Sequence, residues 1–158
     1  MCIRDRFTGV TFAGKGQYLD TGSKVVHNAP HTTSNINSKS ISKDGGVCIY
    51  RGSVVINECA EGSKSNVSCE SLMLDEQSQS DTIPAIVIKN DNVDLGHEAK
   101  IGRISDEAIF YLMSRGLSED EARAMLVRGF VDPVSKALPL EYAVEMNNLI
   151  NLELKGSM

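Results

Sequence analysis

The stretch KDGGVCIYRGSVVI, residues 43–56, decides how the middle of this chain folds. It opens with the cluster Lys43-Asp44-Gly45-Gly46 and continues into two short β-branched runs, residues 47–50 and residues 54–56. Gly and Asp favour turns, whereas Val and Ile are enriched in strands. The stretch therefore predicts a corner followed by strand structure.

The same pattern extends outward in both directions. Further strand-like runs stand at residues 25–27 and 85–88, and polar clusters such as Asn90-Asp91-Asn92 separate them. Short strands that recur about every ten residues are typical of a parallel β-helix or of a β-sandwich. The Ser-, Thr- and Asn-rich residues 32–41 carry few charges, and a stacked architecture explains them as small polar side chains at corners. With 5% aromatic residues and no Trp, we expect a core of Val, Ile and small residues.

After about residue 104 the apolar period becomes helical. Ser105-Asp106-Glu107 supplies a capping residue and acids for a helix start, and Gly116 is placed to end that helix. Ser118-Glu119-Asp120-Glu121 is a capping box for a second helix, and Pro139 suits the first turn of a third. The apolar positions at helical spacing, which we expect mostly to face a helical core, are Ile109, Leu112, Met113, Ala122, Met125, Leu126, Phe130, Tyr142, Met146, Leu149 and Ile150.

These patterns predict three segments. Residues 1–6 are expected to be a non-native or disordered start, residues 7–104 the β core, and residues 105–158 a helical C-terminal domain. The net charge of −5 argues against a general nucleic-acid or anionic-membrane surface. The sequence shows neither a signal-like leader nor a run near the roughly 18 apolar residues of a membrane helix. Cytoplasm or an organelle stroma is therefore the expected compartment.

Few side chains could carry soft-ligand chemistry. No CxxC pair is present, which argues against a zinc knuckle and a thioredoxin-like motif. A full phosphate-binding loop is also missing around Gly14-Lys15-Gly16, so we expect no intrinsic ATPase. Thiolate, imidazole and carboxylate are all competent ligands for iron. The candidates are Cys48, Cys59, Cys69, His27, His31, His97 and Glu98, and the simplest alternative is that they are core thiols and surface histidines.

Several motifs in one frame resemble the SufB/SufD family. They are Gly14-Lys15-Gly16-Gln17, His27-Asn28-Ala29-Pro30, Tyr50-Arg51-Gly52, Cys69-Glu70-Ser71-Leu72, His97-Glu98-Ala99-Lys100-Ile101-Gly102, the stretch from Ile109 to Ala122, and Leu138-Pro139-Leu140-Glu141-Tyr142-Ala143. The resemblance covers nearly everything after Phe7. Within the family, Cys69 and His97-Glu98-Ala99 are similar to the SufB version.

The resemblance implies a right-handed parallel β-helix followed by a small helical domain, mostly β with α. It also implies pairing through the β-helix with a SufD-type subunit or a second SufB, and binding of a SufC-type ATPase by the helical domain. Sulfur-donor proteins would be further partners, without nucleic acid or membrane. The protein would assemble a transient iron–sulfur cluster as a scaffold, not as an enzyme, in the cytoplasm or a plastid stroma.

The resemblance also assigns roles to single residues. Cys69 matches the sulfur acceptor and cluster ligand, Glu98 matches a cluster ligand or assembly residue, and His97 stands beside it. Many SufB members carry an acid where Gly96 stands, and the upstream half of the family's length is not in this sequence. Cys48 and Cys59 match no functional position. The alternatives are a structural SufD-like subunit without a cluster site and, less favoured, a β-helix carbohydrate-active enzyme.

Overall fold

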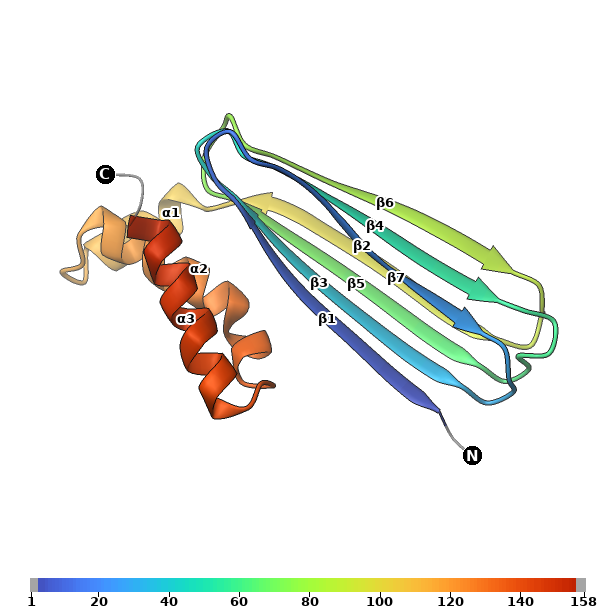
Figure 1. Cartoon of the computed structure of the whole chain (residues 1–158). Coiled ribbons are helices and arrows are strands. Elements are labelled where there is room, and N and C mark those ends of the chain that lie inside the picture. Colours follow the sequence, from blue (N-terminus) through green and yellow to red (C-terminus); the bar gives the residue numbers. More distant parts are fainter. Residues whose placement is uncertain (1–2, 156–158) are drawn as a thin grey trace. The chain divides into compact units, whose positions relative to one another are not determined.

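The computed structural model describes residues 3–155, and all structural statements below concern these residues. Strands come first along the chain and helices last (Figure 1). The elements are β1 (Arg4–Ala13), β2 (Tyr18–His27), β3 (Thr33–Ser42), β4 (Val47–Ile56), β5 (Lys64–Met73), β6 (Gln79–Ile88), β7 (Asp94–Arg103), α1 (Asp106–Met113), α2 (Glu119–Ser135) and α3 (Leu140–Lys155).

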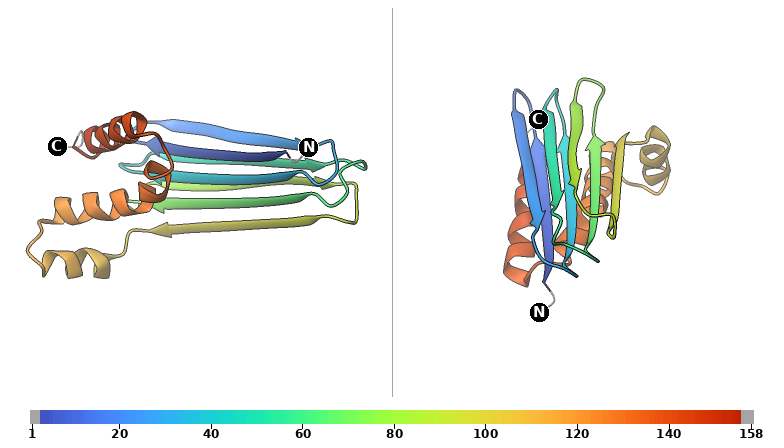
Figure 2. Two further views of the ribbon diagram at one scale, coloured as in Figure 1. Left: turned by 90° about the horizontal axis from the view of Figure 1, so that it is seen from below. Right: turned by 90° about the vertical axis from the view of Figure 1, so that its right-hand side faces the viewer.

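The strands form a parallel β-solenoid of about three turns. Odd-numbered strands make one sheet in the order β1-β3-β5-β7, and even-numbered strands make the second in the order β2-β4-β6. Figure 2 shows the strands as two layers that run alongside each other. Each turn of the solenoid contributes one strand to each sheet, so neighbours within a sheet are about 30 residues apart in sequence. This architecture confirms the predicted parallel β-helix and excludes the sandwich.

The Ser-, Thr- and Asn-rich stretch forms β3, a central strand of the first sheet. Its alternate residues Ser34, Ile36, Ser38 and Ser40 are buried, and they point to the inside of the solenoid. The Ser34 hydroxyl donates to that of Ser65 in the next turn over 2.9 Å. Small hydroxyl side chains therefore stack between turns, which allows a strand with little intrinsic β preference.

Aliphatic residues, one tyrosine and one cysteine form the buried core of the solenoid. The buried cluster consists of Ile36, Tyr50, Val54, Ile56, Ala60, Val67 and Cys69, with Val25, Val93 and Leu95 packed against it. Apart from Tyr50, this composition agrees with the expected core of Val, Ile and small residues. Cys69 belongs to this core, and its position there bears on the site described below.

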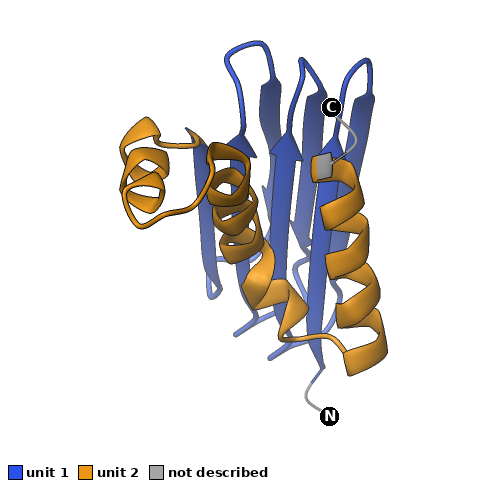
Figure 3. Cartoon of the chain, turned by 90° about the vertical axis from the view of Figure 1, so that its left-hand side faces the viewer, with its two compact units in different colours: residues 1–102 blue, residues 103–158 orange. Residues whose placement is uncertain are grey.

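The chain divides into two compact units, residues 1–102 and residues 103–158 (Figure 3). The boundary expected from the sequence lies two residues later, at 104.

Residues 1 and 2 lie outside the described part of the chain, but Arg4 and Arg6 belong to β1, where they pair with Thr33 and Asn35. That part of the expected non-native or disordered start is therefore regular strand. Within residues 3–155, no helix is long and apolar enough to span a membrane.

The helical unit begins its helices at the capping signals found in the sequence. The Ser105 hydroxyl accepts from the Ala108 amide at 3.3 Å, and Ser118 and Glu121 form a reciprocal capping box. However, α2 continues past Gly129 and Pro133 to Ser135. Several stripe residues expected to face a helical core are instead exposed, namely Met113, Met125, Tyr142 and Leu149. Ile109, Ala122 and Ile150 are buried as expected.

Candidate functional site

Cys69 lies on β5 inside the solenoid. Its side chain belongs to the buried core cluster and is only 2% exposed. Burial raises the pKa of the Cys69 thiol, because an apolar surrounding disfavours the thiolate. In this conformation the thiol is therefore neutral at pH 7 and shielded from solvent.

His97 and Glu98 lie on β7, the last strand of the same sheet, and both are exposed. The Asp94 amide donates to the Ser63 carbonyl at 3.0 Å, and a Cβ on Gly96 would stand 3.0 Å from Asn66 Oδ1. These contacts align Asp94 with Lys64 and Gly96 with Asn66. Continued residue by residue, the alignment places Glu98 beside Ser68 and Ala99 beside Cys69.

The alignment also fixes the faces of the sheet, because successive side chains in a strand alternate between faces. On β5, Val67 and Cys69 are buried, whereas Ser68 between them is half-buried and faces outward. Glu98 shares the outer face with Ser68, while His97 is in phase with the inner face. The structure therefore brings Cys69 and Glu98 onto neighbouring strands but places their side chains on opposite faces of the sheet.

Glu98 sits at the end of a row of alternating charges on that outer face. Its carboxylate pairs with the Lys100 ammonium at 3.0 Å, and this contact raises the pKa of Lys100. Further along, Glu70 forms an ion pair with Lys39. Both partners of the Glu98–Lys100 pair are more than half exposed, so the pair contributes little to stability. Glu98 remains open to solvent and to a cation that could displace Lys100.

The remaining thiols differ in exposure. Cys48 is 1% exposed on β4, and its thiol donates to the Ile41 carbonyl at 3.4 Å. Burial raises the pKa of Cys48, and hydrogen bonding with the backbone of Ala13 and Ile41 offsets part of this increase. Cys59 is exposed at a corner and contacts the Asn28 carbonyl over 3.1 Å. Cys2 lies outside the described residues. Cys48 thus has the environment of a structural thiol.

His27, which the sequence offered as a ligand candidate, is instead part of a buried hydrogen-bond network. Its Nδ1 lies 2.6 Å from the Thr32 hydroxyl and its Nε2 lies 2.9 Å from the Ser34 hydroxyl. The Thr32 hydroxyl in turn contacts that of Ser63 at 2.8 Å. Burial lowers the pKa of His27, and the charge of Asp5 opposes this effect in part. Both ring nitrogens are engaged, so His27 is a structural residue.

We expect this network to make folding pH-dependent. Because the pKa of His27 is lower in the folded chain, the unfolded chain binds the extra proton first, and stability falls as pH drops below the ordinary value of 6.5. Urea unfolding between pH 7 and pH 5 should show this loss in the natural chain and less of it in His27→Gln. His31→Gln, at an exposed position, is the control for the effect of a His-to-Gln substitution itself. Equal slopes in all three proteins would contradict the prediction.

No group of three or more His, Cys, Asp or Glu side chains within residues 3–155 is arranged to hold a metal ion. The candidate site is thus a buried thiol on one face of a sheet and an exposed carboxylate on the other, beside the free edge of β7. Sequence reasoning missed one feature, the small residues that flank Cys69. The alternation of Ser and larger residues in β3 could have indicated these small neighbours of Cys69. This pattern becomes informative only once the register between β3 and β5 is known.

Comparisons with known proteins agree on one family. The family model described as the SufBD core domain of the SUF system for iron–sulfur cluster assembly matches residues 4–130. An iron–sulfur cluster assembly SufBD family protein of Staphylococcus saprophyticus is 56% identical over 149 residues, which are 94% of this chain and 32% of that relative. The relatives of the same description in Staphylococcus haemolyticus and Staphylococcus aureus strain USA300 are 56% and 55% identical with the same coverage. The chain thus spans about a third of the length of the curated relatives it matches.

Proposed function

We propose that this chain, which belongs to the SufBD family of iron–sulfur cluster assembly proteins, is part of a SufB-type scaffold that accepts sulfur and iron and passes on a nascent cluster. The scaffold holds the cluster as cargo and turns over no substrate of its own. The chain spans 32% of its relatives, so this activity belongs to the longer protein. The proposed compartment is the cytoplasm, with a plastid stroma as the alternative.

The observation that carries the proposal is the position of Cys69 in the family's core domain. The thiol is buried, adjacent to the last strand of the solenoid, and flanked by small residues. A thiol in such a place is protected from oxidation until the solenoid opens. Sulfur received there would be equally protected, which suits an intermediate that must reach a cluster without loss.

Glu98 supplies the complementary chemistry. An exposed carboxylate is a hard oxygen ligand that binds iron and releases it readily, so it suits transient loading better than an all-thiolate set. Because Glu98 and Cys69 face opposite sides of the sheet, a shared iron requires the end strand β7 to change its pairing. His97, in phase with the inner face, is the β7 residue that could join Cys69 without such a change.

The open end of the solenoid supports a partner subunit. By register, Ile86 and Ile88 of β6 continue the inner rows of Val54 and Ile56, yet they are 40% and 48% exposed. Ile101 on β7 is 48% exposed as well. Free strand edges and exposed core residues are unfavourable unless another chain covers them. The proposed occupant is a SufD-type subunit or a second SufB-type subunit.

The helical unit offers a second surface. Phe110 on α1 and Leu140, Tyr142 and Leu152 on α3 are each more than 60% exposed, and exposed large apolar side chains of this kind are common where a protein binds a partner. We assign this surface to a SufC-type ATPase. Sulfur-donor proteins would meet the upstream part of the longer protein, and no nucleic acid or membrane is part of the proposed cycle.

The second candidate is a structural SufD-like subunit that carries no cluster. The opposite faces of Cys69 and Glu98 favour it, because a resident cluster would need ligands on one face. The buried thiol beside the last strand favours the scaffold. Family membership gives no support to the carbohydrate-active alternative.

The test requires the longer protein, with its upstream part restored and SufC- and SufD-type partners coexpressed, purified without oxygen. The visible absorption spectrum of the natural complex should show iron–sulfur charge-transfer bands, which Cys69→Ser should lack. Cys48→Ser is the matched control, because Cys48 is buried to the same degree and should leave the bands unchanged. Bands of equal strength in the Cys69→Ser complex would favour the structural subunit.

A further inference from the structure

The inner row that contains Cys69 has one other polar side chain. Ser38 on β3 is the register partner of Cys69, and its side chain is 4% exposed. Neighbouring parallel strands lie about 4.8 Å apart, and register partners point to the same face. The hydroxyl of Ser38 and the sulfur of Cys69 are therefore neighbours inside the solenoid.

The rest of this row consists of small residues. Beyond Ser38 the register partner on β1 is Gly9, and on the other side of Cys69 the alignment of β7 places Ala99. Neither side chain can donate or accept a hydrogen bond. Ser38 is consequently the one side chain next to Cys69 in this row that can form a hydrogen bond.

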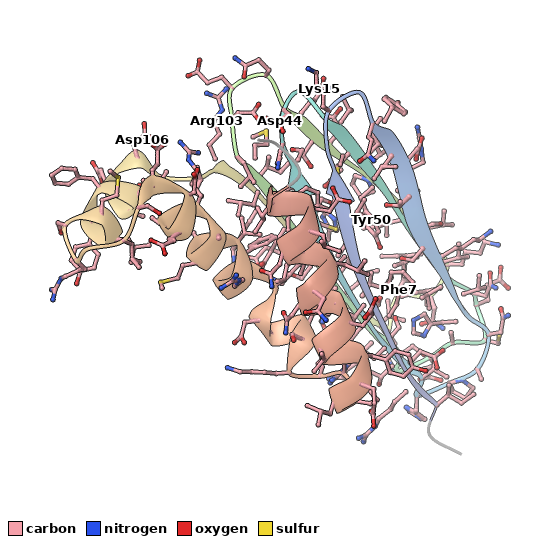
Figure 4. The ribbon with its side chains drawn as sticks, turned by 60° about the vertical axis from the view of Figure 1, so that its left-hand side comes forward. Phe7, Lys15, Asp44, Tyr50, Arg103 and Asp106 are labelled. Carbon is pink, nitrogen blue, oxygen red and sulfur yellow. The ribbon has the colours of Figure 1, made fainter. Side chains whose placement is uncertain are left out.

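The facing sheet contributes one further hydroxyl, that of Tyr50, to the buried cluster. Tyr50, labelled in Figure 4, lies in the same buried cluster as Cys69. Its phenol oxygen is 2.6 Å from the Ser23 hydroxyl on β2. Val67, two residues before Cys69, would be 3.9 Å from a Cβ at Gly52, so the opposite wall here is small or aliphatic apart from Tyr50. Ser38 differs from Tyr50 because it lies on the strand next to Cys69 and is its register partner.

We propose that Ser38 is a positioning residue whose hydroxyl donates a hydrogen bond to the sulfur carried by Cys69. The inference rests on the proposed role of Cys69 as sulfur acceptor. In that step the Cys69 sulfur attacks the outer sulfur of a donor persulfide R–S–SH, the donor S–S bond breaks, R–S⁻ leaves, and Cys69–S–SH forms without net oxidation. The new terminal sulfur lies in an aliphatic surrounding, where a single donor holds it in one orientation and slows its loss to other thiols.

The experiment uses the full chain with inorganic polysulfide as donor, incubated long enough for the core to open. After removal of the donor and addition of excess thiol, the persulfide on Cys69 is trapped by alkylation and followed by peptide mass spectrometry. Trypsin separates the thiols, since Cys48, Cys59 and Cys69 fall in three different peptides. The variants are Ser38→Ala and the matched pair Ser38→Thr and Ser38→Val, which have the same shape but differ in the hydroxyl.

The Cys69 persulfide should decay about 5-fold faster in Ser38→Ala than in the natural chain, the effect of one lost hydrogen bond. It should decay faster in Ser38→Val than in Ser38→Thr, although both add the same bulk. Equal rates of persulfide decay in Ser38→Val and Ser38→Thr would overturn the proposed role of Ser38 and would leave the sulfur-acceptor role of Cys69 intact. A natural chain that takes up sulfur on Cys59 but never on Cys69 would overturn both.

Discussion

In the native chain, a small thiol reagent should alkylate Cys59 about a thousand times faster than Cys69. Cys59 is exposed at a corner, whereas Cys69 is 2% exposed and reacts only when the solenoid opens. An opening that costs about 4 kcal/mol, within the range of local and global unfolding of a small domain, gives a protection of this size. In the closed state, burial also raises the pKa of Cys69 and keeps the thiol in its unreactive neutral form, so reaction proceeds through the open state.

Cys48 provides the internal control for this protection. It is 1% exposed in the same solenoid, on β4 in the second turn, so it should be protected to a similar extent. Peptide mass spectrometry of a time course of alkylation measures all three rates in one sample. In high urea the three rates should converge. A Cys69 that reacts as fast as Cys59 in the native chain would show that the core opens freely at this position.

Protection of Cys69 has a direct consequence for the proposed cycle. A buried neutral thiol cannot attack a donor persulfide, so sulfur transfer must be coupled to an opening of the solenoid. The open end at β6 and β7 is the nearest place for it, because β7 has a neighbour on only one edge. A partner subunit that binds this end would control access to Cys69. Loading of the cluster would then depend on whether the partner subunit is bound at this end of the solenoid.

The sequence predicted the type of fold better than the extent of its strands. The β-branched run at residues 54–56 is only the end of β4, which spans Val47–Ile56. The interior of a strand such as β3 contains Ser and Asn, whose own preference is for turns. β3 is a strand because it pairs with β1 on one edge and with β5 on the other. These partner strands lie about 30 residues away in sequence on either side, so the local sequence of β3 does not reveal them.

The candidate site shows the same limit. The family resemblance singled out Cys69 and Glu98, and the structure places them on the adjacent strands β5 and β7. Their faces could not be predicted, because a shift of one residue between β5 and β7 would invert every side chain of β7. That register depends on the turns of the solenoid, such as the one where Gly62 donates to the Asn92 carbonyl at 2.7 Å. The conformation of those turns, which sets the register, cannot be obtained from composition or spacing.

The corner at residues 43–46 packs closely against the preceding turn of the solenoid. A Cβ at Gly46 would lie 2.4 Å from the Ala13 carbonyl oxygen and 2.7 Å from the Gly14 carbonyl oxygen. Both are backbone atoms of the preceding turn, so no side-chain rotation can relieve the contact. The same corner carries the hydrogen bonds from the Lys43 amide to the Ala13 carbonyl and from the Gln79 amide to the Gly46 carbonyl.

Gly46→Ala should therefore lower the free energy of unfolding of the solenoid by about 3 kcal/mol or more, the upper range for overpacking, because three stacked turns must shift together. Gly129→Ala is the matched control, since its Cβ would meet nothing within 4 Å and it replaces Gly by Ala within α2. It should stabilise the helical unit by about 0.5–1 kcal/mol. Urea unfolding followed by circular dichroism, with hydrogen exchange to assign each transition to its unit, measures both changes. A Gly46→Ala solenoid with a natural midpoint would contradict the prediction and would mean that the turns stack less closely at this corner than the contact requires.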